Sequence, residues 1–301
     1  MSGITIRALD QLGQMAEAVE LQRVFWGNDP ESSIPAHMLY SLASNGGHVL
    51  GAFDGERLIG LLVGFLGTDS REPERPAMAN LHIASKRMIV LPEYRGQGIG
   101  YRLKLAQREV ALRQGIRLVV WTFDPLQAAN AHLNIRKLGA ISRLYLEDYY
   151  GTAPEGRLAT LGSSDRLQAE WWVTNRRVEE RLSGKRGGLK LRQYLDADTP
   201  IINPSSPGQT KETPIPAGDA LRPSGSLALL EIPARFDAIV QQDAELAQRW
   251  RRHTRALFEN LLARGYVVTD FLHEDFEGRE RAFYLLSQTN AQFEQVDFSR
   301  N

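Results

Sequence analysis

The sequence contains no cysteine, and this absence excludes several kinds of chemistry. Without thiols the chain has no disulfide framework, no thiolate nucleophile and no zinc site that needs thiolate ligands. The longest apolar run, residues 58–67, is far shorter than the roughly 20 residues that cross a bilayer, and the N-terminus has no apolar signal core. We therefore expect a cytoplasmic protein that neither enters a membrane nor holds a metal.

An excess of charge of either sign is also missing. Acidic and basic residues number 36 each in 301 residues, so the formal net charge is zero. Domains that bind nucleic acid or anionic lipid usually carry a strong basic patch, and this composition argues against both partners. The length suffices for one large core or two modest ones.

The chain does have a glycine-rich turn between an apolar run and an amphipathic segment. Residues 88–90 read Met-Ile-Val, and residues 91–100 read Leu-Pro-Glu-Tyr-Arg-Gly-Gln-Gly-Ile-Gly. Glycine lets a backbone approach a ligand closely, and the first N–H groups of a helix lack intrahelical acceptors and carry the positive end of the helix dipole. The turn is therefore predicted to bind a phosphate or a pyrophosphate.

Two well-known phosphate loops fit this turn poorly. A Walker loop needs Lys-Ser/Thr after its last glycine, but Tyr101 and Arg102 follow Gly100. The dinucleotide fingerprint Gly-x-Gly-x-x-Gly would place its third glycine one position later. Asp124 lies at about the distance of the ribose-binding acid of that fingerprint, so a dinucleotide-binding oxidoreductase stays open as an alternative.

The turn resembles motif A of the GNAT acyltransferases, which reads Arg/Gln-x-x-Gly-x-Gly/Ala. The matching residues are Arg95, Gly96, Gln97, Gly98, Ile99 and Gly100, with Val90 at the end of the preceding strand. The resemblance implies that the loop amides hold the pyrophosphate of acetyl-CoA or another acyl-CoA, succinyl-CoA included. It also implies cofactor contacts from the backbone of Met88, Ile89 and Val90 and from Asn130.

The order of the expected elements agrees with that family over roughly residues 1–180. Strands are expected at 4–8, 48–53, 58–66, 81–90, 116–123, 141–150 and 166–174, and helices at 10–26, 30–44, 98–114 and 127–138. The resemblance implies an α/β protein with the GNAT fold, a mixed and largely antiparallel central sheet flanked by helices. In the expected helix 98–114, Ile99, Leu103, Ala106 and Val110 form the apolar face, and Lys104 lies off it.

Three segments are predicted along the chain. Residues 1–183 form the acyl-CoA-binding domain, and residues 184–224, rich in proline, form an irregular connector. Residues 225–301 form a β-α-β-β subdomain, with a strand at 227–233, a helix at 236–264 and strands at 266–271 and 281–286. Because about 75 residues are few for an independent core, we expect this subdomain to pack on the first.

The family's chemistry is acyl transfer from a thioester to an amine, which needs a neutral amine, a stabilised oxyanion and a leaving thiolate. The resemblance implies direct attack by a primary amine, so we expect an acetyl- or succinyl-transferring enzyme that acts on a small molecule such as an amino acid. Three residues are candidates for catalysis. His82 and Lys86 share one face of the expected strand 81–90 with Met88 and Val90, and Asp124 ends the next strand.

Each candidate also has a structural interpretation that stays open: a packing histidine, a solvated lysine and a turn-capping aspartate. The position that holds a thiolate-side tyrosine in the family is Ile135 here. This departure leaves a non-catalytic acyl-CoA-binding sensor or scaffold as a further alternative. The expected partner is the small amine, and a homodimer is an open option.

Overall fold

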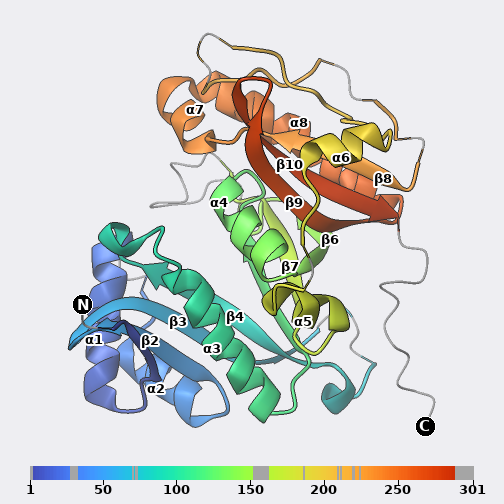
Figure 1. The fold of residues 1–301 in the computed structure, drawn as a ribbon. Coiled ribbons are helices and arrows are strands. Elements are labelled where there is room, and N and C mark those ends of the chain that lie inside the picture. The colour runs from blue at the N-terminus through green and yellow to red at the C-terminus, as the bar shows by residue number, and fades with distance from the viewer. Residues whose placement is uncertain are drawn as a thin grey trace. The chain divides into compact units, whose positions relative to one another are not determined.

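The computed structural model describes residues 3–27, 33–69, 71, 74–151, 163–185, 187–208, 210, 212–218, 221–223 and 225–288. The chain splits into two compact units (Figure 1). Unit 1 comprises Met1–Trp121 and Glu170–Glu179, and unit 2 comprises Thr122–Ala169 and Glu180–Asn301. The chain passes between them three times, inside β5 (Leu118–Phe123), inside β7 (Arg166–Trp172) and inside α5 (Arg176–Leu182). The division at 183 and 224 and the packing of the C-terminal segment on the first domain stay predictions.

Unit 1 contains the first five of the seven strands that the sequence predicts within residues 1–180. Its strands lie in the order β1-β2-β3-β4-β5, and only the β4–β5 pair is parallel. The first four are β1 (Thr5–Ala8), β2 (His48–Asp54), β3 (Arg57–Thr68) and β4 (Leu81–Val90). The expected fold class, a largely antiparallel sheet flanked by helices, is confirmed.

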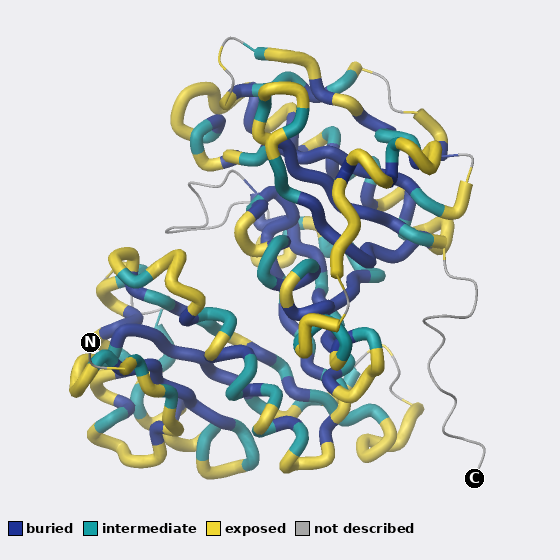
Figure 2. Tube along the Cα trace, in the orientation of Figure 1, coloured by how far each residue is buried: buried dark blue, intermediate teal, exposed yellow. Residues whose placement is uncertain are grey.

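Three helices cover this sheet: α1 (Leu12–Trp26), α2 (Ala36–Ser44) and α3 (Ile99–Arg113). Consecutive residues of β2 and β3 are buried, which requires cover on both faces, and α1, α2 and α3 all contact these strands (Figure 2). The helix expected at 30–44 begins later. Pro35 is its N-cap and has an extended backbone, with ψ at 153°, and residues 28–32 lie outside the described part.

Unit 2 contains a second set of strands in the order β7-β6-β9-β10-β8. These are β6 (Ile141–Leu146), β8 (Leu227–Ile232), β9 (Tyr266–Phe276) and β10 (Arg279–Gln288). β9 and β10 are longer than predicted, because they continue to a two-residue turn in which Glu277 and Gly278 both have positive φ. β6 ends earlier than predicted, since a turn containing Asp148 at a φ of 43° follows it.

The helices of unit 2 depart from the prediction in three places. The helix expected at 236–264 is two helices, α7 (Phe236–Gln242) and α8 (Ala244–Ala263). Asp243 separates them with an extended backbone, and its side chain caps α8 by accepting from the N–H of Leu246. The helix expected at 127–138 is α4 (Ala128–Ala131) followed by a π-helical turn, η4 (His132–Lys137). The segment predicted to be irregular contains α6 (Leu191–Asp196).

A helix of seven residues, α5 (Arg176–Leu182), follows β7. Short 3₁₀ turns lie at Ala77–Ala79 (η2) and Pro92–Tyr94 (η3). None of the described helices combines the length and the apolar character that crossing a bilayer requires.

Candidate functional site

The glycine-rich turn at residues 95–100 joins β4 to α3 on the surface of unit 1. Gly96 and Gly98 both have a φ of 76°, a conformation that residues with a side chain rarely adopt. A Cβ at either position would meet no atom within 4 Å. Glycine is therefore needed here for backbone conformation, and the space over the turn is open to a ligand.

Helix α3 begins directly at this turn. Gly98 is its N-cap, no side chain caps the helix, and its first turn has no acidic residue. The first N–H groups, at residues 99–101, have no intrahelical acceptor by the geometry of an α-helix. With the positive end of the helix dipole they form a surface that favours an anion, and Gly96, Gln97 and Gly98 beside it are exposed.

The strand that leads into the turn has one open edge. β4 pairs with β5 only at Ile83↔Val119 and Ala84↔Val120, whereas its pairing with β3 continues to Val90. In the described part of the chain, residues 85–90 therefore have no ladder partner on the β5 side. At about 3.3 Å per residue, this open edge is about 17 Å long and ends at the glycine turn.

The predicted backbone contacts lie at the far end of this open edge. The side chain of Ile89 is buried in the core of unit 1, and those of Met88 and Val90 are half-buried against the same core. Arg95 is exposed and its Nε lies 3.4 Å from the carbonyl oxygen of Val90. Because the side chains of Met88, Ile89 and Val90 pack against the core, the backbone is the part of the strand that a ligand would contact.

The pairing of β3 with β4 contains a β-bulge at Lys86. Gly64 lies opposite Ser85 and Val63 lies opposite Arg87, so Lys86 is an extra residue between them. Residues opposite each other in an antiparallel pair share a face, and neighbouring residues of β3 alternate between faces. Ser85 and Arg87 therefore lie on opposite faces, and regular alternation is lost at this position.

The bulge places the candidate base, His82, on a different face of β4 from the one that the sequence predicts. His82 lies opposite Gly67, whereas Met88 lies opposite Leu62, so the two side chains are on different faces of the sheet. The prediction that His82 shares a face with Met88 and Val90 is wrong, because the sequence of β4 alone does not show the extra residue. Lys86 itself is exposed at the bulge.

His82 is half-buried near the start of β4. Burial lowers its pKa below the ordinary value and Arg71 adds to the effect, while the backbone of Asn80 and the carboxylate of Asp69 oppose it. The imidazole is thus neutral at pH 7 and able to accept a proton. It lies about 26 Å along the strand from Val90, at the end away from the glycine turn. Its assignment as the base stays a prediction.

Asp124 belongs to unit 2 and is almost fully buried. Its two carboxylate oxygens accept hydrogen bonds from the guanidinium of Arg251 at 2.5 and 2.6 Å, and Oδ1 also accepts from the N–H of Leu126. Burial alone would lower the pKa of Arg251, but Asp124 raises it above its usual value. This pairing gives Asp124 a structural role, and its role in catalysis stays a prediction.

Asn130 also belongs to unit 2, on α4, where it is exposed. Ile135, at the position of the family's tyrosine, lies in the π-helical turn and is fully buried. Asn130 is thus accessible to a ligand, and Ile135 supplies no proton donor.

The sequence interpretation missed a buried polar cluster in unit 1. Lys104, predicted to lie off the apolar face of α3, is 2% exposed, and Gln107 one turn later is fully buried. The buried residues of α3 are 99, 103, 104, 107 and 111, a spacing typical of one helical face, and only the polarity of residues 104 and 107 concealed it. In the described part of the chain no cluster of three or more histidine, aspartate or glutamate side chains is arranged to hold a metal.

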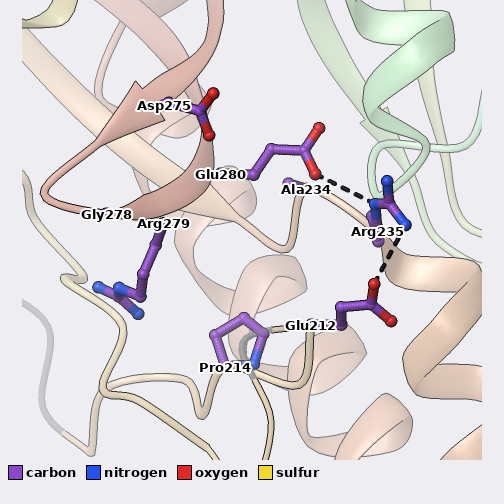
Figure 3. Close-up of a pocket in the computed structure, with 8 residues that line it drawn as sticks. All are labelled: Glu212, Pro214, Ala234, Arg235, Asp275, Gly278, Arg279 and Glu280. Atoms are coloured by element: carbon purple, nitrogen blue, oxygen red, sulfur yellow. Dashed lines mark hydrogen bonds and ion pairs between the residues drawn. The ribbon is translucent and has the colours of Figure 1, made fainter.

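A surface pocket lies in unit 2, between the β9–β10 turn and residues 212–214 (Figure 3). Arg235 in this pocket is paired with Glu280 and with Glu212, at 3.1 Å in each case. Its other charged lining residues are Asp275 and Arg279. The pocket contains none of the residues predicted from the sequence, and the charge of Arg235 is already balanced.

The part of the chain that contains the glycine turn is similar to known proteins. Residues 14–140 match the model of the acetyltransferase (GNAT) family. No curated protein matches the chain. Similar solved structures include an N-acetyltransferase from Staphylococcus aureus Mu50, with 15% identity, a TM-score of 0.46 and coverage of 57% of this chain and 100% of that one.

Two further structures are similar at the same level. The ribosomal-protein-S18-alanine N-acetyltransferase of Escherichia coli has 13% identity and a TM-score of 0.42, over 57% of this chain and 96% of that one. The putative acetyltransferase yncA of Salmonella typhimurium, solved with acetyl-CoA, has 17% identity and a TM-score of 0.44, over 58% of this chain and 96% of that one.

Proposed function

We propose, from the premise that residues 14–140 are a domain of the GNAT acetyltransferase family, that this protein transfers an acyl group from acyl-CoA to a primary amine of a small molecule. Acyl transfer that depends on acetyl-CoA is the general activity of such a domain. The finer parts of the proposal are the acceptor, for example an amino acid, and the acyl group, acetyl or succinyl.

One structural observation carries the proposal. The exposed turn at Gly96 and Gly98 opens helix α3 and continues directly from the open edge of β4. The amides at 96–101 would hold a diphosphate, and the backbone of Met88, Ile89 and Val90 would bind an extended pantetheine arm. Phosphate site and strand edge are thus joined in the order that an acyl-CoA molecule presents them.

The chemistry needs little more from the protein than position and dipoles. Successive N–H groups of a strand point alternately to its two edges, so some N–H groups of residues 85–90 face the open edge and can stabilise the oxyanion of the thioester carbonyl. His82 is neutral at pH 7 and is the candidate acceptor of the amine proton, with Lys86 at the bulge as the other candidate on β4.

Two other functions give distinct results in the same experiment. A non-catalytic acyl-CoA sensor is favoured by one observation, the buried Ile135 in place of a proton-donating tyrosine. The dinucleotide alternative needs Asp124 to bind a ribose, but both oxygens of that carboxylate already accept from Arg251. Three expectations stay predictions. They are a cytoplasmic location, the absence of a nucleic-acid or membrane partner, and a homodimer as an open option.

The test combines calorimetry with a thiol-release assay. The wild-type protein should bind CoA but not NAD, and should release free CoA from acetyl-CoA in the presence of an equimolar pool of amino acids. Binding of CoA without thiol release on any amine would favour the sensor. Binding of NAD without binding of CoA would replace the proposal with the dinucleotide alternative.

A further inference from the structure

A buried polar cluster in unit 1 lies against the start of the open edge of β4. The Nζ of Lys104 donates to the Oγ of Ser85 at 2.9 Å and to the Oε1 of Gln107 at 3.1 Å. The Nε2 atoms of Gln107 and His48 are 2.8 Å apart. The cluster therefore joins α3, β4 and β2 through side chains alone.

Lys104 is an unusual residue at such a position because the described part of the chain provides it with no carboxylate partner. Its other neighbour is the indole of Trp121, whose ring centroid lies 3.5 Å from Nζ. Burial lowers the pKa of Lys104 well below its ordinary value. A buried amine of this kind costs desolvation free energy that an apolar side chain of similar length would avoid, so stability alone does not explain the lysine.

The residues that Lys104 contacts mark the place where β4 and β5 separate. Ser85 directly follows Ala84, the last residue of β4 that pairs with β5, and directly precedes the bulged Lys86. Trp121 directly follows Val120, the partner of Ala84 on β5. Lys104 thus contacts one side chain on each strand, immediately beyond their last pair.

Lys104 lies on α3, the helix that begins at the glycine turn. Lys104 lies five residues after Ile99, the first residue of α3, which is about 7.5 Å along a helix axis. A Cβ at Gly64, the residue opposite Ser85, would lie 2.4 Å from Nε2 of His48 and 2.7 Å from Nε2 of Gln107. The cluster therefore fills the space that a side chain at Gly64 of β3 would occupy. Because Gly64 has no side chain, α3 can pack close to the sheet.

Resting on the acyl transfer proposed above, we propose that Lys104 is a positioning residue for that reaction. Through Ser85 it fixes the β4 backbone at the bulge, through Trp121 it fixes the adjacent end of β5, and through α3 it relates both to the glycine turn. The separation of the strands, and with it the place of the thioester carbonyl against the β4 edge, depends on these contacts.

The test substitutes Lys104→Met, which keeps the length of the side chain and removes its hydrogen bonds. The matched control is Arg113→Met, which removes an exposed cation from the same helix. Thiol release from acetyl-CoA with the amino-acid pool gives kcat and KM, calorimetry gives the Kd for CoA, and a thermal melt gives the Tm. We expect Lys104→Met to lower kcat about tenfold or more while KM and Kd change less than about twofold.

A structural role would give a different pattern. A fall in Tm with equal losses in CoA affinity and kcat, or kinetics equal to those of Arg113→Met, would overturn the proposal for Lys104 while leaving the proposed function intact. If Lys104 acts through Ser85, then Ser85→Ala lowers kcat as well, and the double variant is no slower than Lys104→Met. A wild-type protein that binds no CoA would instead defeat the proposed function itself.

Discussion

The guanidinium of Arg251 donates to both carboxylate oxygens of Asp124, at 2.5 and 2.6 Å, although the two residues are 127 positions apart in the sequence. Both side chains are about 5% exposed. A buried ion pair contributes little net stability compared with an apolar pair, but each partner alone is very costly to leave buried.

Replacing one partner should therefore destabilise unit 2 strongly. We expect Arg251→Met to lower the free energy of unfolding by about 3–5 kcal/mol, because it leaves the Asp124 carboxylate buried without its cation. Urea unfolding followed by tryptophan fluorescence measures the change, since Trp250 on α8 is fully buried in the same unit.

The neighbouring Arg252→Met provides the control, because Arg252 is exposed on the same helix. We expect a change within about 0.5 kcal/mol for this variant, as for most surface substitutions. The double variant Asp124→Asn/Arg251→Met should be more stable than Arg251→Met, since no charge is then left alone. Equal stabilities of Arg251→Met and Arg252→Met would contradict the buried pair.

The pair also shows what could not be predicted from the sequence. Arg251 lies on an amphipathic helix among other arginines, a pattern typical of a solvated face. Its burial depends on a carboxylate far away in the sequence, and no local pattern encodes that contact. The same holds for the break at Asp243, where the end of one helix and the cap of the next occur inside a continuous helical periodicity.

The glycine turn was accessible to prediction because all of its determinants are local. Positive φ at Gly96 and Gly98, and the helix start at residue 99, follow from six adjacent residues. The bulge at Lys86 was not accessible, because it is defined by the register with β3. Strand β4 was thus predicted at its observed bounds, and the face on which His82 lies was predicted incorrectly.

The turn gives a second prediction, on ligand binding. Gly98→Glu should abolish the binding of CoA, because a carboxylate would stand in the open space over the turn and repel the diphosphate. Calorimetry with CoA measures the loss directly.

Gly115→Glu is a matched control for the strain of that substitution. Gly115 has a φ of 69°, a Cβ there would also meet no atom within 4 Å, and it follows the other end of α3. Both variants should lose about 1 kcal/mol of stability, but only the variant at Gly98 should lose CoA. Unchanged affinity in the Gly98→Glu protein would count heavily against a diphosphate site at this turn.

The candidate base gives a third prediction, on the pH dependence of the rate. Because burial lowers the pKa of His82, its neutral form persists below the ordinary value of 6.5, and the acid limb of kcat/KM should fall below that pH. His82→Ala should lower the rate by about a hundredfold, the usual size of general-base catalysis, and remove the acid limb. His37→Ala, at an exposed position on α2, should change neither. Wild-type kinetics in the His82 variant would leave Lys86 as the candidate.

The buried cluster gives a fourth prediction, on the pH dependence of stability. Burial, with Lys104 nearby, lowers the pKa of His48 from 6.5 to about 4. The unfolded chain therefore takes up a proton below pH 6.5 that the folded protein resists until about pH 4, so stability is present above pH 6.5 and is lost as the pH falls through this window.

Each proton costs about 1.4 kcal/mol per pH unit, so His48 should account for a loss of about 2 kcal/mol between pH 6.5 and 5. The variant His48→Gln keeps a side chain able to hydrogen-bond Gln107 and does not titrate. Urea unfolding at pH 7 and at pH 5 should then show a smaller difference for the variant than for the wild type, whatever the variant's stability at pH 7. Equal differences in the two proteins would mean that His48 takes up its proton as easily in the folded state as in the unfolded chain, which is incompatible with its burial against Lys104 and Gln107.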